Sequence, residues 1–275
     1  MINNPTSSVR PLMDAFLQNS DYDGKMFVTS QEAREMVDEN SMVVVVDTNR
    51  PSYTECPELL KMTRTIVVLD HHRQGSEVIQ NAVLSYIEPY ASSACEMVAE
   101  ILQYFAEGVR VKNIEADSLY AGIMIDTNNF MAKTGVRTFE AAAYLRKNGA
   151  DTVKVKGLFT NSIEAYRKKS ALISTAEIFD RCAIAVSDSK SDDIRIIAPQ
   201  AADELLGISG VDASFVIYKT GDVVNISARS LGVMNVQVIM ERLGGGGHQT
   251  MAAAQLTDVS EQKAKEMLIE VLDQD

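Results

Sequence analysis

Apolar runs that end in an acidic residue recur in the first half of the chain. The runs Met42–Val46, Ile66–Leu69 and Gly122–Ile125 are followed by Asp47, Asp70 and Asp126. Unbroken β-branched runs favour strands covered on both faces, as in parallel sheets whose crossover helices bury them. The pattern therefore predicts an α/β unit with three carboxylates at the carboxyl ends of its strands, where open α/β sheets bind ligands.

Helical patterns separate and follow these runs. The spacing of Ser93 and Glu96 is that of a capping box and predicts a helix to about Phe105. Two further helices are predicted over 114–123 and 138–147, the second ending at Asn148-Gly149. Residues 160–179 are charged and lack Gly and Pro, which predicts a connecting helix. We expect a first domain over 1–155, a connecting helix within 156–180 and a second domain over 181–275.

The second half has shorter apolar runs with turn residues between them. Strands are predicted over 183–186, 194–197, 213–218 and 223–227, and helices over 201–206, 234–243 and 260–272. The fold class is therefore α/β, with a parallel-sheet domain followed by a smaller α+β domain.

Composition limits the cellular environment and the binding partners that we expect for this chain. The chain has 275 residues, 46% of them hydrophobic, and no apolar run near the ~18 residues that a membrane span needs. Its start lacks the features of a secretory signal, and its three cysteines form no paired motif, so we expect a cytoplasmic protein with free thiols. The net charge of −12 disfavours binding to long nucleic acids, although a short nucleotide remains compatible.

Polar residues with metal-binding chemistry follow the predicted strands. Asp47, the run Asp70-His71-His72 and Asp126 offer carboxylate oxygens and imidazole nitrogens, a mixed set that suits Mn²⁺, Mg²⁺ or Fe. An Asp after a strand is also a common helix cap or turn residue, and the histidines could be a surface pair. The chain contains only three histidines, however, and all lie in conspicuous polar motifs, which favours a metal site.

The third histidine, His248, follows four glycines, Gly244, Gly245, Gly246 and Gly247. Backbone without Cβ atoms can bring several N–H groups close to phosphate oxygens. Upstream, Arg229 and Ser230 offer a guanidinium group and a hydroxyl to the same kind of ligand. A flexible linker or a helix cap would also explain glycines, and an exposed Arg is ordinarily just solvated, so this pattern alone leaves the alternatives open.

Together these motifs resemble the DHH/DHHA1 phosphoesterase family. The resemblance rests on Asp47-Thr-Asn, Asp70-His71-His72, Asp126-Thr-Asn and the Gly-rich run before His248, and it covers nearly the whole chain. Within the family, Ile226-Ser-Ala-Arg-Ser230 and Asn235-Val236 are most similar to the catalytic part of membrane-anchored cyclic-di-AMP phosphodiesterases.

The resemblance implies roles for individual residues. Asp47 would bridge two divalent ions, usually Mn²⁺, and His71 and Asp126 would complete the ligands of the second ion. Asp70 and His72 would support this set and, with His71, form the catalytic group. Arg229, Ser230, Asn235, the glycine run and His248 would hold the phosphates and sugars of a nucleotide. The resemblance also implies a homodimer and no membrane contact by this segment.

One motif of the family is missing. Relatives carry His-x-x-x-Asp-x-Asp on an earlier strand, whereas no histidine precedes His71 here, which indicates truncation at the amino end. We therefore expect the family reaction, metal-dependent hydrolysis of cyclic di-AMP to linear pApA, to be weak or absent in this chain alone. The alternatives are hydrolysis of short linear oligonucleotides such as pApA, and a nucleotide-binding fragment with impaired catalysis.

Overall fold

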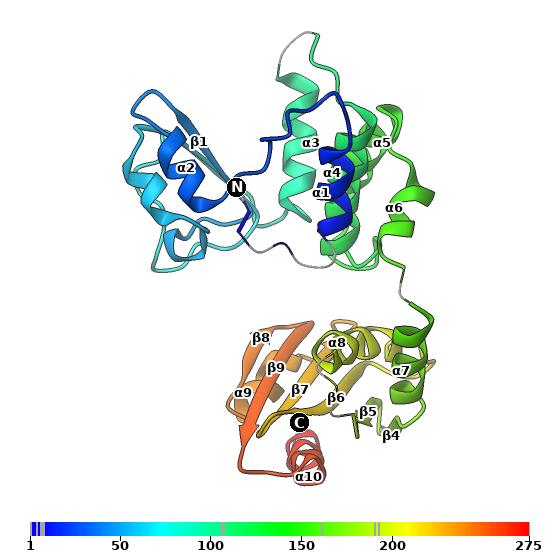
Figure 1. Ribbon diagram of the computed structural model, residues 1–275. Coiled ribbons are helices and arrows are strands. Elements are labelled where there is room, and N and C mark those ends of the chain that lie inside the picture. Colours follow the sequence, from blue (N-terminus) through cyan, green and yellow to red (C-terminus); the bar gives the residue numbers. More distant parts are fainter. Residues whose placement is uncertain are drawn as a thin grey trace. The chain divides into compact units, whose positions relative to one another are not determined.

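The computed structural model describes residues 2–3, 5, 9–105, 108–160, 162–189, 191 and 193–274. The chain divides into two compact units, residues 1–160 and 161–275, and the division falls within the predicted connecting segment (Figure 1). No described helix is both long enough and apolar enough to cross a membrane.

The first unit contains a three-stranded parallel sheet in the order β1-β2-β3. Its strands are β1 (Met42–Val46), β2 (Thr65–Asp70) and β3 (Leu84–Ile87), and its helices are α1 (Arg10–Leu17), α2 (Ser30–Met36), α3 (Ala94–Tyr104), α4 (Asn113–Asp126), α5 (Val136–Lys147) and α6 (Thr152–Leu158), with short 3-10 helices η1 (Pro51–Tyr53) and η2 (Pro57–Lys61). The first two strands confirm the sequence prediction, and β3 was not predicted.

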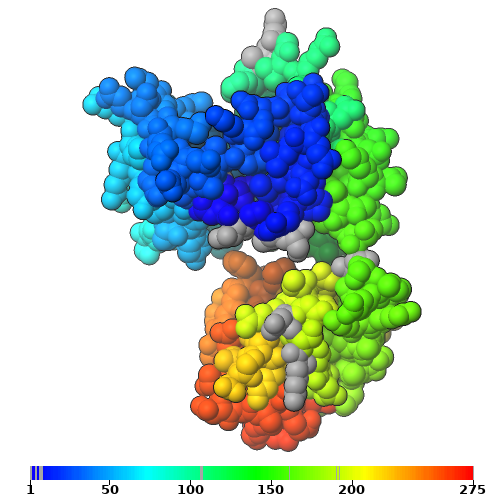
Figure 2. Space-filling view, in the orientation of Figure 1, coloured from blue at the N-terminus to red at the C-terminus, as the bar shows by residue number. Residues whose placement is uncertain are grey.

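Three apolar clusters of described residues stabilise this unit. One packs the sheet against the following loops around Ile66 and Val68, another lies among α3, α4 and α5 around Ile123 and Leu145, and a smaller one packs α2 against η2 around Leu59. Helix α1 contacts α4, and in Figure 2 the blue amino-terminal residues form part of the surface of this unit. The prediction that both faces of the strands are covered is wrong for β1, because Met42, Val44 and Val46 are 63, 47 and 51% exposed.

Residues 122–125, predicted as a strand, form the end of α4, so that Asp126 is the last residue of a helix. The apolar run fits a strand as well as a helix, because α4 buries residues on more than one side, including Ile114, Ala121 and Ile123. Gly122 of α4 lies very close to Cys95 of α3, because a Cβ atom at Gly122 would lie 2.2 Å from Cys95 Sγ. The missing side chain lets α3 pack directly on α4.

The other predicted helices of the first unit are present. Ser93 caps α3 by accepting a hydrogen bond from the backbone N–H of Glu96, and the helix ends one residue before Phe105. Helix α5 ends at Lys147, and Gly149 follows with a φ of +98°, as expected for a glycine that ends a helix.

The second unit is a six-stranded mixed sheet in the order β4-β5-β6-β7-β9-β8. Its strands are β4 (Glu177–Phe179), β5 (Cys182–Val186), β6 (Ala213–Thr220), β7 (Val223–Ser230), β8 (Gly246–His248) and β9 (Met251–Thr257), and its helices are α7 (Ile163–Ile173), α8 (Ile194–Leu205), α9 (Val236–Arg242) and α10 (Glu261–Leu272). Strands β5 and β6 are parallel and the remaining pairs are antiparallel.

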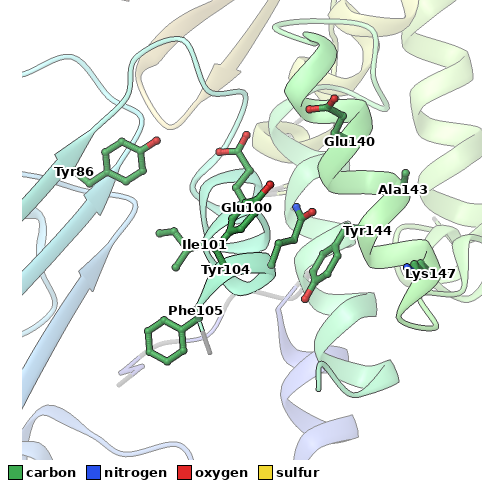
Figure 3. A pocket seen from close by; sticks show the side chains of 10 residues that line it. Tyr86, Glu100, Ile101, Tyr104, Phe105, Glu140, Ala143, Tyr144 and Lys147 are labelled. Atoms are coloured by element: carbon green, nitrogen blue, oxygen red, sulfur yellow. The ribbon is translucent and has the colours of Figure 1, made fainter. Parts of the chain in front are cut away.

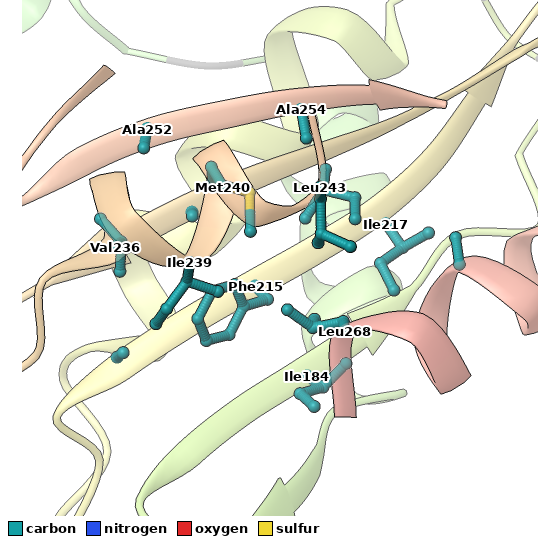
Figure 4. Close-up of a cluster of buried hydrophobic side chains, with 14 of the residues drawn as sticks. Ile184, Phe215, Ile217, Val236, Ile239, Met240, Leu243, Ala252, Ala254 and Leu268 are labelled. Carbon is teal, nitrogen blue, oxygen red and sulfur yellow. The ribbon is translucent and has the colours of Figure 1, made fainter. Parts of the chain in front are cut away.

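Helices cover both faces of this sheet. Helices α7 and α8 pack on one face, and α9 and α10 pack on the other. Figure 4 shows this second core, in which Phe215 and Ile217 of β6 lie against Ile239 and Met240 of α9 and Leu268 of α10. All five side chains are fully buried, so this face forms the main core of the unit.

Two elements of the second half differ from the prediction. Residues 194–197 begin helix α8 instead of forming a strand. The buried positions Ile194, Ile197, Ala201 and Leu205 follow helical spacing over the longer segment, which a four-residue window could not show. The predicted connecting helix over 160–179 is shorter, since α7 ends at Ile173 and strand β4 follows.

Candidate metal and nucleotide sites

The carboxyl edge of the first sheet gathers the predicted metal ligands. Asp47 follows β1 directly, and His71 and His72 follow β2, which is paired in parallel with β1. Their donor atoms, one from each residue, all lie within 4.8 Å of one another. Parallel pairing therefore brings together residues that are more than twenty positions apart in the chain.

Asp126 reaches the same place from a different kind of element. His71 Nε2 lies 3.3 Å from Asp47 Oδ1 and 3.9 Å from Asp126 Oδ2. The strand predicted before Asp126 is wrong, yet the carboxylate converges as expected because α4 ends beside the sheet. The last carbonyl groups of a helix carry partial negative charge, so this end of α4 adds to the negative potential around His71.

The neutral tautomer of His71 leaves Nε2 available to a metal ion. Its Nδ1 lies 3.3 Å from the carbonyl oxygen of Ala91, which can only accept, so Nδ1 carries the hydrogen. In the neutral ring the Nε2 lone pair then faces Asp47 and Asp126. In the charged ring Nε2–H can donate to Asp47, which raises the pKa of His71, and burial opposes this rise. Burial, followed by the nearby Asp47 carboxylate, raises the pKa of Asp126.

The backbone is strained at this edge. Asp47 has a φ of +65°, and the three residues Asn128, Asn129 and Phe130 after α4 have φ values of +46, +57 and +65°. Residues other than Gly rarely adopt positive φ values, and such backbone strain concentrates at functional sites. Two carboxylates held close together by a strained backbone, with an imidazole between them, fit a divalent cation.

Asp70 differs from the other predicted residues because it points into the protein. Its side chain is fully buried, and its oxygens accept hydrogen bonds from Asn49 Nδ2 at 2.6 Å and from His72 Nδ1 at 2.7 Å. Asp70 therefore supports the site from behind. Asn49 is a participant that the sequence analysis missed, although its place two residues after Asp47 was a signal.

The second unit gathers its predicted residues at one end of the sheet. Arg229 of β7 pairs with Met251 of β9, which pairs with His248 of β8, so these side chains share one row and one face. Ser230 ends β7, and Asn235 caps α9 by accepting from the N–H of Gln237. Arg229 and His248 therefore lie on the same face of the sheet, on two strands separated by β9.

Arg229 is already partly engaged. Its Nε donates to Asp203 Oδ1 at 2.8 Å and its Nη1 to the carbonyl oxygen of Ala228 at 3.0 Å, and its side chain is 11% exposed. The Ser230 hydroxyl accepts from the N–H of Gly232 at 2.9 Å. These bonds hold both side chains in place, which favours a pre-organised site over a mobile one.

Packing accounts for much of the glycine run. A Cβ atom at Gly245 would lie 2.1 Å from the Ala253 carbonyl oxygen, and one at Gly247 would lie 2.5 Å from Ala252 Cα. Gly244 has a φ of +78° just after α9. Only Gly246 has open space where a Cβ atom would lie and a φ outside the positive range. Packing or backbone conformation therefore explains the glycine at the other three positions.

The structure also contains a groove that the sequence analysis did not predict. Aromatic and acidic side chains of α3, α5 and β3 line an open space of about 980 Å³, including Tyr86, Glu100, Tyr104, Phe105 and Tyr144 (Figure 3). None of its lining residues belongs to the predicted metal or nucleotide sites. Tyr104 and Phe105 are 87 and 70% exposed. Two adjacent aromatic residues at the end of a predicted helix were the sequence feature that could have indicated this groove.

Comparison with known protein families identifies the class of protein. The N-terminal domain of the DHH family matches residues 7–123, and the DHHA1 domain matches residues 180–274. The chain therefore belongs to the DHH family and carries a DHHA1 domain as its second unit.

Individual relatives agree with this assignment. The chain is 49% identical over 247 residues to the cyclic-di-AMP phosphodiesterase GdpP of Geobacillus thermodenitrificans, and 47% identical over 251 residues to the cyclic-di-AMP phosphodiesterase PdeA of Listeria monocytogenes. These alignments cover 89 and 90% of this chain but only 38% of either relative. The chain thus spans well under half the length of these relatives.

A solved structure supports the fold. An exopolyphosphatase-related protein from Bacteroides fragilis superposes with a TM-score of 0.77 at 16% sequence identity, covering 94% of this chain and 79% of that one. This likeness confirms the α/β fold class.

Proposed function

We propose that this chain binds divalent cations, with Mn²⁺ the best fit, through Asp47, His71 and Asp126, and acts on cyclic di-AMP to give linear pApA. The observation that supports this most is the convergence of the two carboxylates on His71 Nε2. The names of the relatives point to the same substrate.

The proposed reaction breaks one bond between phosphorus and a ribose 3′ oxygen. Divalent ions held by Asp47, His71 and Asp126 would make water nucleophilic at neutral pH and would stabilise charge on the phosphoryl oxygens. The oxygen of water bonds to phosphorus, and the 3′ oxygen leaves with a proton. The product keeps a 5′ phosphate and gains a 3′ hydroxyl group, as in pApA.

Within this reaction, His72 is placed to deliver the proton. Its Nδ1–H is held by Asp70, so Nε2 is the nitrogen free to exchange protons, and the side chain is 56% exposed. A hydrogen bond to a buried carboxylate fixes the orientation of the ring. In the second unit, the Arg229 guanidinium and the N–H groups near His248 would hold phosphate oxygens, with Ser230 and Asn235 beside them.

The test is titration of the purified chain with cyclic di-AMP in the presence of Mn²⁺, followed by chromatography of the products. Among the described residues one cluster of donors is present, so we expect nucleotide binding with slow turnover. Binding that Arg229→Ala weakens and pApA as the product would support the proposal. Consumption of pApA without attack on cyclic di-AMP would favour the oligonucleotide alternative, and failure to bind either compound would refute nucleotide recognition.

The cytoplasmic location and the homodimer remain predictions. Sedimentation of the purified chain at several concentrations would test the dimer directly.

A further inference from the structure

Asn49 lies behind the metal ligands and is one of the buried polar residues of the first unit. Its side chain is 3% exposed, and Nδ2 donates to Asp70 Oδ2 at 2.6 Å and to the carbonyl oxygen of His72 at 3.3 Å. Its own carbonyl oxygen accepts from the N–H of Ile79 at 2.9 Å. The residue therefore ties the end of β1 to the segment that follows β2.

Asp70 passes this connection on to His72. One carboxylate oxygen accepts from Asn49, and the other accepts from His72 Nδ1 at 2.7 Å and from the backbone N–H of His72 at 3.1 Å. The Asp70 side chain has no solvent exposure, so no bulk water replaces a lost partner. Both oxygens need protein donors to keep the carboxylate in this orientation.

Asn49 is kept at an energetic cost. Its Oδ1 atom is buried and has no hydrogen-bond partner among the residues that the structure describes. A buried, unsatisfied polar atom is destabilising, so packing alone would be better served by an apolar side chain of similar shape. The cost is consistent with a requirement for the amide donor on Asp70.

We propose that Asn49 is a positioning residue that acts through Asp70 to fix the His72 ring with Nδ1 protonated and Nε2 facing outward. The consequence for hydrolysis rests on the proposed function, whereas the orientation of His72 does not. Without the amide, Asp70 Oδ2 lacks its donor and the carboxylate is free to turn. The His72 ring then loses its fixed acceptor.

The test compares metal-free wild-type protein with Asn49→Leu, a change of nearly equal size that removes the donor. Nitrogen-15 NMR of the histidine rings reports which nitrogen carries the hydrogen. We expect His72 of the wild type to be the Nδ1–H form at neutral to mildly alkaline pH, and Asn49→Leu to show a mixture of both forms. His71 should keep its own form in both proteins because Ala91, and not Asp70, fixes it.

Thr63→Val is the matched control. Thr63 is also buried in the first unit, and its hydroxyl donates to the carbonyl oxygen of Ser41 and accepts from the N–H of Thr65 at the opposite end of the sheet. The change removes these two hydrogen bonds at nearly constant size, and we expect it to lower the melting temperature without altering the His72 signals. This separates positioning from a general loss of stability.

Kinetics provide a second readout wherever hydrolysis is measurable. Loss of positioning should lower kcat by about 10- to 100-fold, the range typical of residues behind a metal site, with KM changed little. A wild-type His72 in the Nε2–H form overturns the proposal even if Asn49→Leu does not fold, and so does an unchanged His72 in a folded Asn49→Leu. Absence of hydrolysis in every protein counts against the proposed function alone.

Discussion

The two candidate sites differ in what the fold requires of their residues. At the metal cluster, the chain adopts a positive φ at Asp47, holds the carboxylates of Asp47 and Asp126 near one another, and leaves Asn49 Oδ1 without a described partner. None of these features helps the unit to fold. At the nucleotide-binding end, by contrast, the fold itself requires most of the conspicuous glycines. The comparison teaches that an unfavourable arrangement indicates function more strongly than an unusual composition does.

Replacing His71 should have the largest effect on the metal cluster. His71→Ala removes the nitrogen that lies between the two carboxylates, so we expect Mn²⁺ affinity to fall by more than about 100-fold, beyond the loss typical of outer partners. Calorimetric titration measures this change, and circular dichroism checks that the fold is retained. An affinity within about threefold of wild type would contradict the assignment of His71 as a ligand.

The glycine run should separate into structural and open positions. Gly245→Ala places a Cβ atom against the Ala253 carbonyl oxygen, and we expect it to destabilise the second unit by about 1–3 kcal/mol, the usual cost of overpacking. Gly246→Ala meets open space and serves as the control with near wild-type stability. Urea unfolding of both variants measures the difference, and equal stabilities would show that packing does not explain Gly245.

Replacing Arg229 should weaken cyclic di-AMP binding more than replacing Met251, its partner on the adjacent strand. Arg229→Ala removes the guanidinium group and leaves Asp203 without its ion-pair partner, so we expect cyclic di-AMP affinity to fall about tenfold, as for loss of one charged hydrogen bond. Met251→Ala changes the adjacent position on the same face and controls for nonspecific disturbance. Equal losses in both variants would argue against a specific phosphate contact.

Asp126 should show the opposite effects on stability and metal binding. Its pKa is raised in the folded protein, so the stability it contributes at low pH is lost as the pH rises through that value. Asp126→Asn should therefore melt at a slightly higher temperature than wild type at pH 7 without metal, with the difference vanishing below the ordinary value of 3.8.

Saturating Mn²⁺ should reverse this order, because a ligand that binds the folded state stabilises it by an amount that grows with the logarithm of its concentration divided by its Kd. Thermal melts with EDTA and with Mn²⁺ make the comparison. If Asp126→Asn is less stable than wild type in EDTA at pH 7, the Asp126 carboxylate stabilises the metal-free fold. The expectation that its charge destabilises that fold is then wrong.

Local sequence predicted those elements whose pattern is complete within a short window. The strand Met42–Val46, the cap at Ser93 and the end of α5 at Gly149 follow from the residues themselves. The prediction was wrong for 122–125 and 194–197, where a short, mostly apolar run of four residues fits a strand and a buried helix equally well. Only the neighbours decide such cases, as Cys95 does for Gly122.

The sequence by itself determined which residues are candidates for the chemistry: the carboxylates, the paired histidines and the Arg, Ser and His of the second half are conspicuous by type and order. Tertiary structure decided how they meet. Parallel pairing of β1 with β2 joins Asp47 to His71, the end of a helix supplies Asp126, and the row from Arg229 to His248 arises from strand register. Burial alone revealed the roles of Asp70 and Asn49, because desolvation makes their hydrogen bonds obligatory and no local pattern encodes it.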